Sequence, residues 1–151
     1  MMNAMRPLIA FCLVAVVALA PFSAFAQATE AELTVHVVLA SKKPGKTDKR
    51  LARFKKQFGD FAYQSYQLLS VERAKVKLGE SQTVKLAGGK ELTLKFTSMG
   101  KGNRARVMLS IPDVIETTVA IVPGGDVVLG GPAMPHGDGV LFVPVTLNRL
   151  N

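Results

Sequence analysis

The chain has 151 residues and one cysteine, Cys12, which lies among the first 26 residues. This length is that of one ordinary domain with its own core. Once a leader containing Cys12 is removed, no thiol remains, so disulfides, thiolate catalysis and cysteine-bound zinc are excluded. The formal net charge of +8, from 19 Lys plus Arg against 11 Asp plus Glu, favours an anionic partner.

The first 26 residues have the three-part pattern of a secretory signal peptide. Arg6 precedes an apolar run from Leu8 to Ala20, and small residues end the segment at Ala24-Phe25-Ala26. Thirteen apolar residues are too few to cross a bilayer, which needs ~20 residues of helix. We therefore predict a cleaved signal peptide over residues 1–26 and one exported domain over residues 27–151, in the periplasm, secreted or at the cell surface. No later segment is apolar enough to be a transmembrane span.

The first predicted strand covers residues 31–41, "AELTVHVVLAS". Leu33, Val35 and Val37 alternate with the more polar Thr34 and His36, but the second face also carries apolar residues further along. A strand that is apolar on both faces is typical of the middle of a sheet.

A loop and an amphipathic helix are predicted next. Pro44-Gly45 indicates a loop over residues 41–46, and Thr47 is suited to cap a helix that begins there and stops at Gly59. Asp48 suits the positive end of the helix dipole. At helical spacing one apolar stripe forms, consisting of Leu51, Phe54, Phe58 and Phe61. We predict a helix of about three turns that buries this stripe.

The positive charge is concentrated in this loop and helix. Between Lys42 and Lys56 there are eight cations and one acid, whereas the rest of the predicted mature chain is neutral. Lys49, Arg53 and Lys56 fall opposite the apolar stripe. The predicted binding residues are Lys42, Lys43, Lys46, Lys49, Arg50, Arg53 and Lys56. An ordinary solvated helix face is the plainer interpretation, but the lack of compensating acids favours an anionic ligand.

The rest of the chain is predicted to be strands. Alternating segments cover residues 63–71, 73–79, 82–87, 90–99, 104–112, 114–122, 127–131 and 139–148. Gly88-Gly89 predicts a tight turn, and residues 130–139, "GGPAMPHGDG", predict a loop. Because Pro144 lacks an N–H donor, the last strand is predicted to lie at a sheet edge or to contain a bulge. The fold class is mainly β (α+β): an antiparallel two-sheet β-sandwich of about eight strands with one amphipathic helix.

Catalytic and metal sites find little support in the residue pattern. His136 and Asp138 could supply two metal ligands, with Glu116 or Asp126 nearby, yet a metal site needs three or four converging ligands. We expect instead a turn in which Asp138 bonds its own backbone. There is no Gly-x-Ser-x-Gly nucleophile motif, and the acids are scattered singly. No enzyme activity, metal or cofactor is predicted.

Three further possibilities concern the aromatic residues. Insertion of the helix into a membrane would remove its phenylalanines from the core. Nucleic acid is a poor candidate, since the cations and aromatics lie on opposite helix faces and an exported protein seldom meets it. Strand alternation places Tyr63 and Tyr66 on opposite faces, so they are not expected to form one binding platform.

The chain resembles small exported proteins of Gram-negative bacteria that have no assigned activity. The resemblance rests on the signal peptide, "TVHVVLAS", the short helix, "YQSYQLLS", and hairpins that end near "GGP" and "GVLFVPV". It brings no functional residues with it.

We predict a non-enzymatic binding or scaffold domain whose basic helix and loop contact an anionic lipid or glycan surface, or an envelope protein complex. The alternative is a structural subunit of an oligomer that adds its exposed edge strand, residues 139–148, to a neighbouring chain. A third hypothesis is a metal-binding or hydrolytic protein centred on His136 and Asp138.

Overall fold

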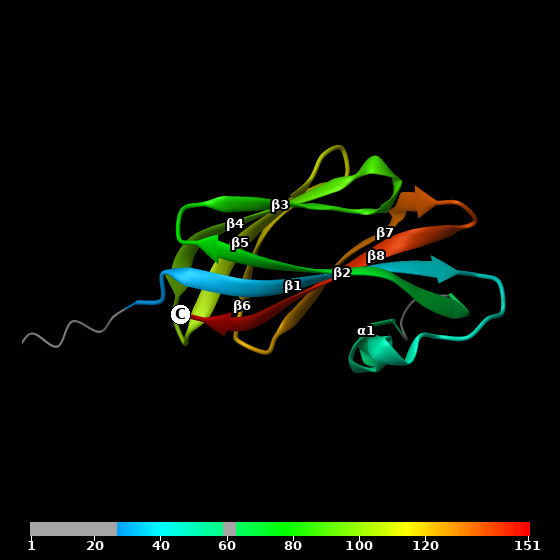
Figure 1. The fold of residues 1–151 in the computed structure, drawn as a ribbon, viewed down its shortest axis with the longest axis horizontal. Coiled ribbons are helices and arrows are strands. Elements are labelled where there is room, and N and C mark those ends of the chain that lie inside the picture. Colours follow the sequence, from blue (N-terminus) through cyan, green and yellow to red (C-terminus); the bar gives the residue numbers. More distant parts are fainter. Residues whose placement is uncertain (1–26, 59–62) are drawn as a thin grey trace, which may run out of the picture.

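Two antiparallel sheets of four strands each pack face to face (Figure 1). The fold is that of a computed structural model, which describes residues 27–58 and 63–151. The predicted signal peptide, and Gly59 and Phe61 at the end of the predicted helix, lie outside the described residues. The predicted two-sheet β-sandwich is confirmed.

The first sheet has the strand order β2-β1-β8-β7, and the second has the order β3-β4-β5-β6. The strands are β1 (Glu30–Ser41), β2 (Ser65–Lys77), β3 (Ser81–Lys85), β4 (Glu91–Gly100), β5 (Arg104–Ile111), β6 (Ile115–Ile121), β7 (Asp126–His136) and β8 (Gly139–Leu150). Two short 3-10 helices, η1 (Lys49–Phe54) and η2 (Ala87–Gly89), and one α-helix, α1 (Lys55–Phe58), complete the described elements. No helix among the described residues is long and apolar enough to span a bilayer.

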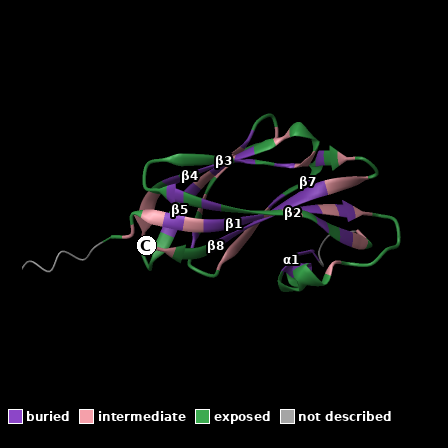
Figure 2. Cartoon of the chain, in the orientation of Figure 1, coloured by how far each residue is buried: buried purple, intermediate pink, exposed green. Residues whose placement is uncertain are grey.

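The main core lies between the two sheets. Side chains alternate along each strand, so every second residue of β1 from Ala31 to Val37, such as Leu33 and Val35, points inward and is fully buried. Val107 and Leu109 on β5 do the same from the second sheet. Figure 2 shows buried residues repeating along these strands. As predicted, β1 is a central strand that is buried on both faces.

A second apolar cluster lies on the other face of the first sheet, under η1 and α1. Leu51, Phe54 and Phe58 are 1%, 0% and 3% exposed, which confirms the predicted apolar stripe. They pack with Val38, Ala40, Tyr66, Leu68 and Phe142. The predicted helical segment is present over residues 49–58, but its first six residues form a 3-10 helix and only the last four form an α-helix.

The predicted edge position of the last strand is wrong. β8 lies between β1 and β7, and no register shift occurs at Pro144. Pairing between β1 and β8 is interrupted there and resumes at Val145 on one side and Phe142 on the other. The sheet tolerates the missing N–H of Pro144, because residues before and after it in β8 pair with β1 and hold the strand in place.

The predicted loop over residues 130–139 is mostly strand, since β7 continues to His136. Gly130 and Gly131 have φ values of 98° and 112°, at a register shift between Gly130 and Pro135. A Cβ on Gly130 would lie 2.3 Å from the carbonyl oxygen of Leu141, so this close approach requires glycine. The two strands predicted over residues 63–79 are likewise one strand, β2.

Candidate functional site

The basic helix is fixed to β2 at both of its ends. The N–H of Asp48 donates to the carbonyl of Tyr66 at 3.0 Å. The hydroxyl of Tyr66 in turn donates to the carbonyl of Phe58 at 3.0 Å. The rings of Phe58 and Tyr66 also stack, with centroids 4.6 Å apart. These contacts turn the apolar face inward and leave the charged face in solvent.

Asp48 caps the helix, a role that the sequence pattern assigned to Thr47. Its Oδ1 accepts a hydrogen bond from the N–H of Arg50 at 2.9 Å. The guanidinium of Arg50 donates to the same carboxylate, with Nη2 2.7 Å from Oδ2. The Arg50 side chain and N–H lower the pKa of Asp48 to about 2. Arg50 is thus paired within the cap, although its side chain remains 69% exposed.

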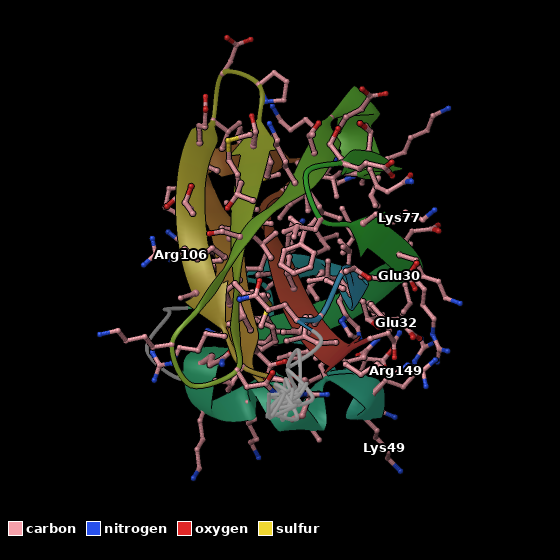
Figure 3. The ribbon with its side chains drawn as sticks, turned by 90° about the vertical axis from the view of Figure 1, so that its left-hand side faces the viewer. Glu30, Glu32, Lys49, Lys77, Arg106 and Arg149 are labelled. Atoms are coloured by element: carbon pink, nitrogen blue, oxygen red, sulfur yellow. The ribbon has the colours of Figure 1, made fainter. Side chains whose placement is uncertain are left out.

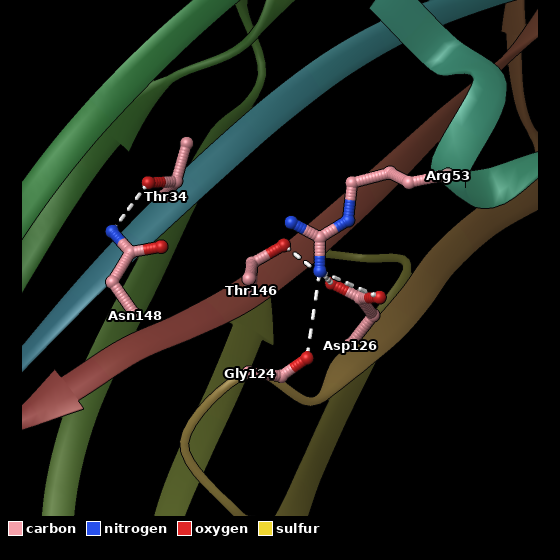
Figure 4. Close-up of polar contacts among 6 residues, drawn as sticks. All are labelled: Thr34, Arg53, Gly124, Asp126, Thr146 and Asn148. Atoms are coloured by element: carbon pink, nitrogen blue, oxygen red, sulfur yellow. Dashed lines mark hydrogen bonds and ion pairs between the residues drawn. The ribbon is translucent and has the colours of Figure 1, made fainter.

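Arg53 joins the helix to the start of β7 (Figure 4). Its Nη2 lies 2.9 Å from Oδ1 of Asp126 and 3.4 Å from the carbonyl oxygen of Gly124. The hydroxyl of Thr146 donates to Oδ1 of Asp126 at 2.6 Å. The Arg53 guanidinium also lies 5.3 Å from the ring centre of Phe54. Arg53 is therefore a structural residue of the helix attachment.

His36 lies under the helix beside this ion pair. Its ring meets the ring of Phe54 edge to face, with centroids 5.0 Å apart, and its buried Nδ1 has no hydrogen-bond partner among the described residues. Burial lowers the pKa of His36, and the charge of Arg53 lowers it further, whereas Asp126 and the backbone of Pro144 oppose this.

Further polar side chains lie on the outer face of the first sheet, beyond the contacts of Arg53, Asp126 and Thr146. Asn148 donates from Nδ2 to Oγ1 of Thr34 at 2.7 Å (Figure 4). These contacts were not predicted from the sequence, although the polar residues at alternate positions of β1 and β8 are a visible signal.

Lys43 is paired with Asp138, which lies in the turn between β7 and β8 beside the end of β1. Their Nζ and Oδ2 atoms are 2.8 Å apart. The hydrogen bond raises the pKa of Lys43 and lowers that of Asp138. Both side chains are 75% exposed, so the pair adds little stability. The expectation that Asp138 bonds its own backbone is not met, since its carboxylate accepts from Lys43.

Four of the seven predicted binding residues remain unpaired. They are Lys42, Lys46, Lys49 and Lys56, all exposed and without an ion pair among the described residues. Lys55, which is not among the seven predicted binding residues, is also exposed and has no ion pair among the described residues. Figure 3 shows Lys49 extending away from the body of the protein. The structure thus divides the basic stretch into three cations that are paired with carboxylates and five lysines that face solvent.

A cavity of about 460 Å³ opens beside these lysines. Its wall is formed by Thr47, Asp48, Lys49, Leu51, Ala52, Lys55, Phe58, Tyr63, Gln64 and Tyr66. The rings of Tyr63 and Tyr66 lie edge to face, with centroids 6.5 Å apart. The prediction that they lie on opposite faces is therefore wrong, because Tyr63 precedes β2 and strand alternation does not apply to it. Lysines and aromatic rings share one hollow.

His136 and Asp138 are not joined by further ligands. Within residues 27–58 and 63–151, no group of three His, Cys, Asp or Glu side chains is placed to hold a metal ion. Asp126, suggested as a third ligand, binds Arg53 and Thr146 instead.

The chain matches no protein-family model, no curated protein and no solved structure.

Proposed function

We propose that this protein is an exported, non-enzymatic binding domain that contacts an anionic component of the cell envelope through the exposed lysines of its basic helix and loop. The single observation that carries the proposal is the set of five solvent-facing lysines without an ion pair among the described residues. Elsewhere in the predicted mature chain, cations and acids balance. A concentrated positive field of this kind attracts phosphate-bearing surfaces.

The way in which the helix is held supports this proposal. Phe54 and Phe58 are buried against the first sheet, so the helix cannot turn its aromatic face to a membrane without losing its attachment. Lys49, Lys55 and Lys56 are thereby presented on a segment that the aromatic cluster holds against the sheet, which lowers the entropic cost of binding. The protein would bind at the surface of an envelope structure rather than insert into it.

A charge-reversal experiment tests the proposal. The triple variant Lys49→Glu, Lys55→Glu and Lys56→Glu changes three exposed lysines, and Arg53 is left intact because it holds the helix to Asp126. Each lysine near an anionic bilayer contributes ~1 kcal/mol, so we expect retention on vesicles of phosphatidylglycerol and phosphatidylcholine to fall by roughly a hundredfold. Vesicles of phosphatidylcholine alone and fragments of bacterial envelope serve as further probes.

The matched control reverses three exposed lysines of the second sheet and its turns, Lys85, Lys95 and Lys101. It carries the same net charge as the test variant, so equal losses for both would mean that only overall charge matters. The proposal would be overturned if retention of the unchanged protein on vesicles did not depend on salt concentration. It would also be overturned if the test variant were retained as well as the unchanged protein. Binding to envelope fragments but not to vesicles would identify a protein or glycan as the anionic partner.

A further inference from the structure

The two sheets of the sandwich end in four edge strands, and three of them carry features that prevent pairing with another chain. Natural proteins protect edges with charges, prolines, bulges or short strands. On β2 the charges are Glu72, Arg73, Lys75 and Lys77. β7 contains two prolines and a register shift. β3 is five residues long and ends in Lys85.

β6 lacks this protection. Its sequence, "IETTVAI", has one charge and no proline over its whole length, and five of its seven residues are β-branched, whereas the uncharged first half of β2 is contacted by the helix through the hydrogen bond from Asp48 to Tyr66. β6 pairs with β5 in unbroken register over its whole length, from Ile115 to Ile121. On its other side no strand pairs with it among the described residues. The backbone N–H and C=O groups on that side are a template for a further strand.

We propose that β6 pairs antiparallel with β6 of a second copy of this chain, about a twofold axis at Thr118. Residues that lie opposite each other in an antiparallel pair must point to the same face of the sheet. With Thr118 opposite its own copy, all seven residues of β6 are paired, and Glu116 lies opposite Ala120 of the second copy. Both of these residues are on the outer face, since their β5 partners are Ser110 and Arg106.

Charge complementarity favours this register. Arg106 of β5 lies opposite Ala120 of β6, and in the proposed dimer Ala120 lies opposite Glu116 of the second copy. Two strand spacings therefore separate the backbones of Arg106 and that Glu116, a distance of roughly 10 Å. Ala120 between them is small, and the two long side chains can meet across it. Arg106 and Glu116 are both exposed and have no ion pair among the described residues. Figure 3 shows Arg106 extending outward beside the strands of the second sheet.

Apolar contact on the other face agrees with the same register. Ile115, the first residue of β6, is a large apolar side chain that is 37% exposed. The proposed pairing places it opposite Ile121 of the second copy, on the side of the sheet that faces the core. A register shifted so that Glu116 met its own copy would set like charges opposite each other, which is destabilising.

This pairing uses the second sheet and is independent of the basic surface on the first sheet. A dimer would carry two basic surfaces, and simultaneous engagement of both would strengthen attachment to an envelope surface. The two proposals can therefore be tested separately. A variant that no longer dimerises but still binds vesicles, or one that dimerises but no longer binds vesicles, would show that the two surfaces act independently.

Sedimentation velocity over a range of protein concentrations tests the dimer. We expect a monomer–dimer equilibrium in the unchanged protein. Thr118→Lys places two lysines at the twofold axis and should raise the dissociation constant at least tenfold, whereas Thr83→Lys, on the exposed edge strand β3 of the same sheet, should leave it unchanged. Circular dichroism checks that each variant is folded.

A charge swap tests the register. Arg106→Glu and Glu116→Arg should each weaken the dimer several-fold, and the double variant should restore it, because the pair is re-formed with its signs exchanged. A strict monomer at every concentration would overturn the proposal. A dimer that is unaffected by Thr118→Lys, or single variants that the double variant does not rescue, would overturn it as well.

Discussion

The two apolar clusters of this protein are built from different kinds of side chain. The main core between the sheets is almost wholly aliphatic, with Phe96 as the one aromatic ring among its buried described residues. The cluster under the helix is aromatic: Phe54, Phe58, Tyr66 and Phe142 are buried there, and Tyr63 packs against them. Paired sheets interdigitate small branched side chains, whereas a single short helix on an outer sheet face needs large rings to fill the space beneath it.

The difference shows that the helix is an addition to a sandwich that has its own core. η1 and α1 together span only ten residues, too few to be stable in isolation. Their position depends on the aromatic cluster and on the contacts of Arg53 and Asp48. The proposed binding surface is therefore less stable than the scaffold that carries it, and variants can separate the two.

The largest effect is expected from Phe96→Ala in the main core. Phe96 is fully buried on β4, and removal of its ring should cost about 3–5 kcal/mol of unfolding free energy. Urea denaturation measures this loss, which should affect both sheets in one transition. If the helix unfolded separately while the sheets kept their stability, the assignment of Phe96 to the common core would be wrong.

A smaller global effect is expected from Phe54→Ala. Phe54 is also fully buried, but it contacts the helix and the outer face of one sheet only. The free energy for opening the helix should fall by roughly 3 kcal/mol, while the urea midpoint moves less than in Phe96→Ala. Hydrogen exchange at the amides of residues 51–58 measures the local change. An equal loss of protection in β4 and β5 would show that the two clusters unfold together.

The smallest effect concerns pH. Burial and the Arg53 charge lower the pKa of His36, so the folded protein binds a proton less readily than the unfolded chain. Full stability should therefore be present above about pH 6.5, the ordinary value for histidine, and part of it should be lost as pH falls from there through the lowered pKa. The loss should be under about 1 kcal/mol, because water screens the partly exposed ring.

Thermal melts at several values between pH 8 and pH 5 check this expectation. His36→Gln should remove the pH-dependent step in this window. The matched control is His136→Gln, which changes the only other histidine and should retain the step. A step that persists in His36→Gln and disappears in His136→Gln would reverse the assignment.

Much of the fold could be predicted, because strand alternation and the helical apolar stripe are local signals. Pro144 shows the limit of such signals. Its missing donor is a local fact, but whether a sheet tolerates it depends on the neighbouring strands, and β8 has one on each side. Gly130 and Gly131 led to the wrong prediction of a loop for a similar reason, since glycines with positive φ values occur in bulged strands as well as in loops.

The candidate site could be predicted only in part. The position of the cations on one helix and loop follows from the sequence, but their partners come from distant residues: Asp138 for Lys43 and Asp126 for Arg53. The contact between Tyr63 and Tyr66 at the cavity could not be predicted either. Tyr63 precedes β2, so the alternation of side chains along that strand does not apply to it.

The sequence by itself determined the alternation of the strands, the apolar stripe of the helix and the concentration of positive charge, since each depends on the spacing of neighbouring residues along the chain. Only the tertiary structure decided which cations are neutralised, which strands lie at the edges and which edge is left unprotected. Those properties depend on contacts between residues far apart in the chain, and pairing of strands and ions across the fold is not encoded in any short stretch.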